Sequence, residues 1–238
     1  VIFAIKEDYD HREVYYYENK RFDGELHMYY DDKKQQPESI GRFKNGKKSG
    51  IQEQYYENGI LKISKNCVDG LEDGKYEEYF EDGEVKLNCF YIEGKRNGKL
   101  QEFYKEGVLK EESNYYYGNL DGISSKFHKN GKLLSTGMYK EGIKTGIWNF
   151  YDENESLVRK ETWKDGKLNG QRIELENGNI QMSSIYENGE LEGEFIIYGK
   201  NKNIIHLIHY EEGRKNGKEI IYNESGNIIK ETDYKNNM

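Results

Sequence analysis

The chain has 238 residues and a net charge of −8, and hydrophobic and charged residues each make up 34% of it. This composition argues against a thick conventional core. The 22 tyrosines instead suit a thin structure, in which rings cover apolar surface while their hydroxyls stay wet. The acidic balance disfavours nucleic acid and membrane lipid as ligands, because both need clustered Lys and Arg. No apolar run approaches the roughly 20 residues of a membrane helix.

The chain is organised by a repeat of about 24 residues, within the range typical of repeat architectures. A glycine closes each repeat, and a second glycine usually stands four residues before it. An aromatic column lies three residues earlier again, and it includes Tyr91, Tyr115, Tyr139 and Trp163. The closing glycines are Gly24, Gly50, Gly74, Gly98, Gly122, Gly146, Gly170, Gly193 and Gly217. We therefore expect a single array over residues 1–238, in which each unit contacts only its neighbours.

Residues 1–17 are interpreted as an incomplete first unit. Tyr17 falls in the aromatic column, so residues 12–17 are expected to form the closing strand of this unit. Residues 1–5 are the candidate partner strand. The segment 12–17 would then be one open edge of the sheet, and residues 227–234 the other, which leaves edge-to-edge homo-oligomers open. The chain begins with Val1, so a targeting segment could precede it.

Each full repeat is predicted to be a β-hairpin. In the second, the strands 51–56 and 61–68 flank Glu57-Asn58-Gly59. A three-residue loop with glycine in the left-handed position suits this sequence and pairs Tyr55 with Leu61. A two-residue turn would pair Tyr56 with Leu61 instead. Hairpins whose turn glycine is replaced, at Lys33, Glu155 and Lys202, are expected to be looser or differently turned. The Gly-x-x-x-Gly segment is interpreted as a longer connection to the next hairpin.

The two cysteines are predicted to be free thiols. Cys67 and Cys89 fall on the second strands of adjacent repeats, so one strand should separate them. That places them about 10 Å or more apart, beyond the roughly 7 Å between Cα atoms that a disulfide can bridge.

The phrases YYENGILK, YFEDGEVK, FYKEGVLK and FHKNGKLL, each followed by Tyr-x-x-Gly-x-x-x-Gly or a close variant, resemble MORN repeats, in particular the bacterial second variant. The resemblance covers residues 12–238. It implies an all-β fold: an elongated, single-layer antiparallel array of about nine hairpin repeats. Family members mostly serve as binding or scaffolding surfaces, some attach to membranes, and some bacterial relatives are antitoxins. The resemblance brings no catalytic residues.

No catalytic, cofactor or metal site is indicated. His206 and His209 are the two histidines closest in sequence, and on a strand they would point to opposite faces. There is no Cys-x-x-Cys, no phosphate-binding glycine loop before a helix and no nucleophile elbow. We therefore expect a protein that is not an enzyme.

A variable aromatic stripe is the candidate partner-binding site. It follows the first aromatic position of each hairpin and should lie on the face opposite Tyr55 and Leu61. Packing of a thin sheet explains such a stripe more simply than a ligand does, although exposed aromatic patches also mark interaction sites. The candidate residues are Tyr30, Tyr56, Phe80, Tyr104 and His128 in this column, together with Trp148, which has the same strand parity.

The expected function is a non-enzymatic interaction or scaffold module that presents an aromatic-rich sheet surface to a protein partner. Two narrower alternatives stay open: an antitoxin or immunity protein that neutralises a toxin, and a surface adhesin that binds carbohydrate. The sequence leaves the partner, the oligomeric state and the binding face undetermined. Localisation is equally open, between the cytoplasm and the surface of a bacterial cell.

Overall fold

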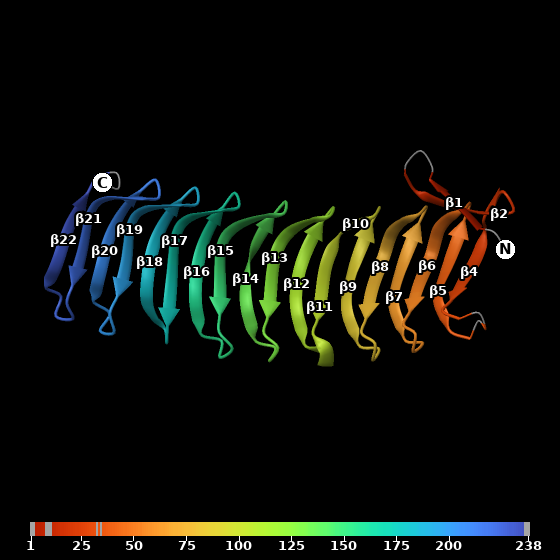
Figure 1. The fold of residues 1–238 in the computed structure, drawn as a ribbon, viewed down its shortest axis with the longest axis horizontal. Coiled ribbons are helices and arrows are strands. Elements are labelled where there is room, and N and C mark those ends of the chain that lie inside the picture. The colour runs from red at the N-terminus through yellow and green to blue at the C-terminus, as the bar shows by residue number, and fades with distance from the viewer. Residues whose placement is uncertain (1–2, 8–10, 32, 34, 236–238) are drawn as a thin grey trace. The chain divides into compact units, whose positions relative to one another are not determined.

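The computed structural model describes residues 3–7, 11–31, 33 and 35–235. The chain divides into two compact units, Val1–Asn119 and Leu120–Met238. In both units antiparallel strands follow one another in chain order (Figure 1). The described residues form one helical element, a single 3-10 turn η1 (Lys105–Gly107), and no helix long and apolar enough to cross a membrane.

The main sheet of unit 1 is a hairpin meander in which consecutive strands pair antiparallel, except that β10 and β11 both pair with β9. Its strands are β4 (Gly24–Tyr29), β5 (Pro37–Lys44), β6 (Lys47–Tyr55), β7 (Leu61–Val68), β8 (Leu71–Tyr79), β9 (Val85–Ile92), β10 (Lys95–Arg96), β11 (Gly98–Phe103) and β12 (Leu109–Tyr116).

Unit 2 continues the same pattern, with consecutive strands paired from β13 to β22. Its strands are β13 (Asn119–Phe127), β14 (Leu133–Lys140), β15 (Ile143–Tyr151), β16 (Leu157–Lys164), β17 (Lys167–Glu176), β18 (Asn179–Glu187), β19 (Glu190–Tyr198), β20 (Ile204–Glu211), β21 (Arg214–Tyr222) and β22 (Ile228–Tyr234). In neither unit do the described residues pair the first strand with the last, so neither sheet closes on itself. The all-β hairpin meander is confirmed.

The loop inside each repeat has the predicted register. Tyr55 pairs with Leu61, and the loop is closed by the Tyr56 N–H donating to the Ile60 carbonyl at 2.8 Å. Gly59 has a φ of 83° and donates to the Tyr56 carbonyl at 2.9 Å. The expectation of looser hairpins at Glu155 and Lys202 is wrong. Both residues adopt the left-handed conformation, with φ of 68° and 62°, and make the same hydrogen bonds as glycine does.

The expected longer connection between repeats is also wrong, because a two-residue turn joins them. Val68 pairs with Leu71 across Asp69 and Gly70, whose φ values of 49° and 87° fit a type I′ turn. The second glycine of the Gly-x-x-x-Gly motif, Gly74, already lies inside β8. Strands that leave a type I′ turn pair at once, so the motif leaves no room for a loop.

Two sets of hydrogen bonds tie each turn to the preceding repeat. The Gly70 N–H donates to the Lys48 carbonyl at 2.9 Å, and equivalent bonds recur in both units. The Asp73 carboxylate accepts the Glu93 N–H at 3.2 Å, and in unit 2 Asp121 accepts the Glu141 N–H at 3.1 Å. These bonds explain why Asn or Asp often precedes the closing glycine.

The incomplete first unit forms a separate three-stranded sheet of β1 (Phe3–Glu7), β2 (Glu13–Tyr17) and β3 (Lys20–Arg21). Pairing of residues 3–5 with the second strand is confirmed, while Val1 and Ile2 lie outside the described residues. The first strand of the main sheet is therefore β4, which corrects the predicted edge at residues 12–17. The small sheet is fastened through the Tyr15 N–H, which donates to the Gly46 carbonyl at 2.7 Å.

The two faces of the main sheet differ in burial. We call face A the face that carries Phe43, Cys67 and Tyr91 in unit 1 and Tyr139, Trp163 and Tyr186 in unit 2. Face B carries Tyr55 and Leu61. Most of the buried side chains lie on face A, including Cys67, Cys89, Leu100, Trp148 and Ile208. Both cysteines are free, as predicted, because β8 separates their strands.

Candidate functional site

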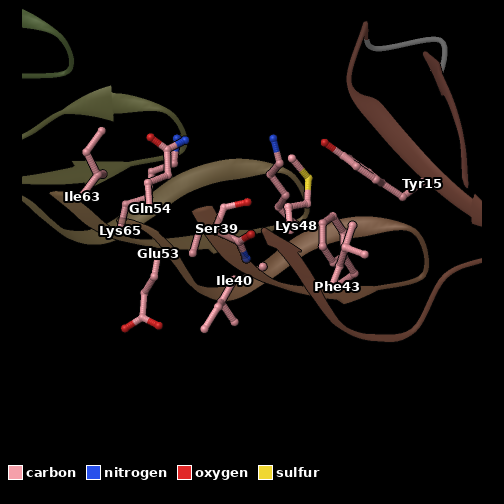
Figure 2. Close-up of a pocket in the computed structure, with 13 residues that line it drawn as sticks. Tyr15, Ser39, Ile40, Phe43, Lys48, Glu53, Gln54, Ile63 and Lys65 are labelled. Carbon is pink, nitrogen blue, oxygen red and sulfur yellow. The ribbon is translucent and has the colours of Figure 1, made fainter. Parts of the chain in front are cut away.

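A hollow of about 200 Å³ lies on face A of unit 1, where β2 packs over β5 and β6 (Figure 2). Its apolar lining comes from Leu26, Met28, Phe43 and Ile63. Met28 is 49% exposed, so part of its apolar side chain faces solvent beside the hollow. Figure 2 shows Ile63 and Gln54 projecting to one side of the sheet, and Glu53 and Ile40 to the other.

Tyr15 closes one end of the hollow. Its ring centroid lies 4.5 Å from that of Phe43, with the planes inclined by 50°. The Lys48 ammonium lies 5.6 Å from the Tyr15 ring centroid and 3.0 Å from the Glu13 carboxylate. Burial is the largest single effect on the pKa of Lys48 and lowers it, but the hydrogen bond with Glu13 and the interactions with Tyr15 and the Glu13 charge together raise it. The same hydrogen bond lowers the pKa of Glu13. The rim is thus charged and internally neutralised.

The floor of the hollow depends on Gly41, which has no side chain. A Cβ on Gly41 would stand 2.8 Å from Gln52 Oε1 and 2.9 Å from the Phe43 ring. Gln52 is 7% exposed and donates through Nε2 to the Arg42 carbonyl at 2.8 Å. On the far side the Lys65 ammonium pairs with Glu72 at 2.8 Å. Lys48, Gln52 and Lys65 thus have partners within the chain, which leaves the apolar lining as the main surface that the hollow offers to a ligand.

The predicted stripe lies at the ends of the hairpins, where much of it connects one hairpin to the next. The Tyr30 hydroxyl donates to the Tyr55 carbonyl at 2.6 Å, and the Tyr56 hydroxyl to the Tyr79 carbonyl at 2.8 Å. In unit 2, His128 Nε2 lies 3.0 Å from the Tyr151 carbonyl oxygen. Phe80 and Tyr104 occupy equivalent positions, and the Lys110 ammonium lies 5.9 Å from the Tyr104 ring centroid.

The structure brings Tyr30 and Tyr56 together, around a recess that they share with Glu57, Asn58 and Glu81. Trp148 belongs to a different environment. It is 4% exposed in the middle of β15, where its indole Nε1 donates to the Met138 carbonyl at 3.3 Å. The hydrogen bonds of Tyr30, Tyr56 and His128 give the stripe a structural role in linking hairpins.

Sequence reasoning missed Tyr15, Lys48 and Ile63 as site residues. Met28 and Leu26 share the strand parity of the stripe, which was the one signal that pointed toward them. Nothing in the repeat pattern could place Tyr15 over Phe43, because β2 leaves the main sheet. The hollow is recognised only from the structure, whereas the sequence pattern points only to Leu26 and Met28 in its lining.

No catalytic constellation is seen among the described residues. They hold no group of three or more His, Cys, Asp or Glu side chains placed to bind a metal ion. Burial raises the pKa of Cys67 and raises that of Cys89 to about 11, so both are poor nucleophiles. His206 lies 2.8 Å from Glu219, and His209 lies 3.1 Å from the Lys218 carbonyl oxygen. These contacts are those of structural side chains.

The MORN repeat variant family matches six segments that together cover more than half of the chain, residues 48–66, 72–93, 96–115, 120–141, 144–165 and 215–236. The chain therefore belongs to this family of repeats. Its members are generally non-catalytic binding modules, and this chain is a repeat-based binding or scaffold module.

No curated protein matches the chain. Among solved structures, it is similar to TcdB2-TccC3-Cdc42, with 10% identity over 92% of this chain and 14% of that one, at a TM-score of 0.21. It is also similar to TcdB2-TccC3-TEV, with 11% identity over 99% of this chain and 16% of that one, at a TM-score of 0.22. A third similar structure is the Photorhabdus luminescens Tc holotoxin pore with a TccC3 mutation. The identity is 9% over 99% of this chain and 16% of that one, at a TM-score of 0.20. At these TM-scores the likeness carries no argument about fold or function.

Proposed function

We propose that this chain is a non-enzymatic module that holds a protein partner on face A of its repeat sheet, with the hollow of unit 1 as an anchoring point. One observation carries the proposal: the exposed Met28 side chain stands beside an apolar hollow whose charged rim is already neutralised. An apolar centre inside a polar rim is the usual anatomy of a protein interface.

The size of the hollow favours a protein side chain over a free small molecule. Its volume of about 200 Å³ is below the roughly 300–1,000 Å³ of small-molecule pockets. One large aliphatic or aromatic side chain suits it better, and such anchors dominate the binding energy of many interfaces. Membership of a family of binding modules supports the same conclusion.

The test uses a peptide display library panned against the whole chain, with two matched variants. Met28→Glu places a charge at the hollow. Ile51→Glu places the same charge on face B of β6, where Ile51 is exposed to a similar extent, 43% against 49%. Selected peptides should bind the wild type and Ile51→Glu alike and lose about tenfold or more in affinity for Met28→Glu. The proposal fails if no peptide is enriched, or if binding ignores Met28→Glu in a variant whose circular dichroism is unchanged.

A further inference from the structure

The hollow of unit 1 adjoins two further depressions. The first is small, about 160 Å³, and shares Met28, Ser39 and Gln54 with the hollow. The second has a volume of about 350 Å³ and shares Tyr30 with the first. We call the second the loop recess, and its lining residues are Tyr30, Tyr56, Glu57, Asn58 and Glu81. Because neighbouring depressions share side chains, the three make one groove that leads from the hollow to the hairpin loops.

The two ends of this groove differ in chemistry. The hollow offers apolar side chains such as Leu26 and Met28, whereas the loop recess combines tyrosine rings with carboxylates. Within the described part of the chain, neither Glu57 nor Glu81 forms an ion pair or a side-chain hydrogen bond. Glu81 uses its backbone carbonyl, not its carboxylate, to accept a hydrogen bond from Asn58 Nδ2 at 2.9 Å. The loop recess therefore has two carboxylates that the rest of the chain leaves unpaired.

Two lysines near the loop recess have surroundings of their own. The Lys105 ammonium lies 4.0 Å from Asp82, the residue that follows Glu81. Lys62 lines the small middle depression together with Glu38, and its ammonium lies 5.3 Å from the Tyr56 ring centroid. The middle depression thus holds one cation and one carboxylate, whereas the residues that line the loop recess include two carboxylates and no cation.

We infer that the loop recess receives a basic side chain of the protein partner, from the same extended segment whose apolar side chain fills the hollow. The inference rests on the proposed function and names a second anchor of the partner. Arginine suits the recess best, because its planar guanidinium stacks on tyrosine rings and forms paired hydrogen bonds with a carboxylate. Tyr30 is 41% exposed, so its side chain is accessible to such a contact.

A basic side chain fits the loop recess better than a free metal ion does. Ca²⁺ takes roughly six to eight oxygen ligands, and the described residues contain no group of three or more His, Cys, Asp or Glu side chains placed to bind a metal ion. The net charge of −8 also favours the approach of a basic segment. One peptide can reach both ends of the groove, because the loop recess and the hollow adjoin the same middle depression.

The geometry of β4 sets the spacing of the two anchors. Tyr30 follows Met28 by two residues and Leu26 by four. At about 3.3 Å per residue, Tyr30 lies about 7 and 13 Å along the chain from them. An extended peptide rises by the same amount per residue and points alternate side chains to one side. The apolar and the basic residue of the partner should therefore lie two or four positions apart.

The experiment measures fluorescence anisotropy of a labelled short peptide in which a phenylalanine and an arginine lie four positions apart among serines and threonines. A second peptide carries glutamine in place of the arginine. The whole chain should bind the arginine peptide about fivefold or more tightly than the glutamine peptide, and this preference should shrink at higher salt. Glu57→Gln/Glu81→Gln should reduce the preference to about twofold or less without changing the affinity for the glutamine peptide.

Glu153→Gln/Glu176→Gln is the matched control, because it removes the same two charges from hairpin ends of unit 2. Glu153 has the same place in its loop as Glu81, and its carbonyl accepts a hydrogen bond from Asn130 Nδ2 at 2.9 Å. The control variant should keep the full arginine preference. Met28→Gln removes an apolar side chain from the hollow without adding a charge, so it should weaken the binding of both peptides by the same factor.

Equal binding of the two peptides, or no binding of either, would overturn the inference. So would an arginine preference that survives in Glu57→Gln/Glu81→Gln, or one that the control variant also abolishes, since the attraction would then be general. If Met28→Gln leaves both affinities unchanged, the proposed function fails at the hollow, while an arginine preference that depends on Glu57 and Glu81 still supports the recess. Circular dichroism and the melting temperature of each variant show that it is folded.

Discussion

The Gly137→Ala variant tests how tightly face A of unit 2 is packed. A Cβ on Gly137 would stand 2.1, 2.2 and 2.5 Å from three ring atoms of Trp148. The backbone of Gly137 is not left-handed, so alanine is acceptable there except for this clash. The indole is 4% exposed, so the atoms packed around it oppose its displacement. Overpacking of this kind costs about 1–3 kcal/mol.

Displacing the indole would also lengthen the 3.3 Å hydrogen bond from Trp148 Nε1 to the Met138 carbonyl, which is worth about 0.5–1.5 kcal/mol. We therefore expect Gly137→Ala to lower the free energy of unfolding by about 2–4 kcal/mol, measured by urea denaturation followed by tryptophan fluorescence. The double variant Gly137→Ala/Trp148→Leu should recover part of this loss, because it imitates the small and aliphatic pair at the equivalent positions two repeats earlier, Cys89 and Leu100, which are both buried. A single variant as stable as the wild type would refute the reasoning.

Three further predictions concern other parts of the sheet. Tyr56→Phe removes the hydroxyl that donates to the Tyr79 carbonyl at 2.8 Å, and should lower the free energy of unfolding by about 0.5–1.5 kcal/mol in chemical denaturation without changing the circular dichroism spectrum. The buried thiols of Cys67 and Cys89 should react with a thiol reagent at neutral pH only after unfolding, and rapid reaction of the native chain would contradict their burial. Hydrogen bonds from Tyr234, Lys215 and His206 lower the pKa of Glu219 from 4.5 to about 2. Since the folded-state pKa is depressed, this stabilisation is present above pH 4.5 and is lost as the pH falls toward 2, so Glu219→Gln should flatten the acid side of the stability profile of unit 2.

The repeat pattern was enough to predict the strands and their pairing within hairpins. The register of Tyr55 with Leu61 follows from a three-residue loop, because Gly59 marks the left-handed position. The pattern failed where glycine has two roles. Gly70 turns the chain, whereas Gly74 lies four residues later within a strand, and spacing alone cannot tell these apart. Glu155 shows the converse, since a residue other than glycine adopts the left-handed conformation when the rest of the hairpin determines it.

The candidate site could be predicted only in part. Strand alternation predicts a face for Tyr56, but it does not reveal that the Tyr56 hydroxyl donates to the Tyr79 carbonyl of the next hairpin. The hollow depends on β2 folding over Phe43, which is a departure from the repeat and has no periodic signal. The two rings that face the Lys144 ammonium, those of Trp148 and Trp163, come from β15 and β16, so spacing along the chain does not show that they lie together.

The residues that recur and those that vary have different roles on face A. The turn glycines and the aromatic column recur because every hairpin needs the same hydrogen bonds to its neighbour. The middle column, which pairs across the hairpins, has no such constraint. In unit 1 it runs through Leu26, Gln52, Tyr76 and Leu100, and in unit 2 through Ser124, Trp148, Arg172, Phe195 and Glu219. Where this column helps to line the hollow of unit 1, at Leu26 and Gln52, the backbone is already paired between neighbouring strands. A repeat sheet of this kind can therefore change the side chains that this column presents while it keeps the hydrogen bonds between its hairpins.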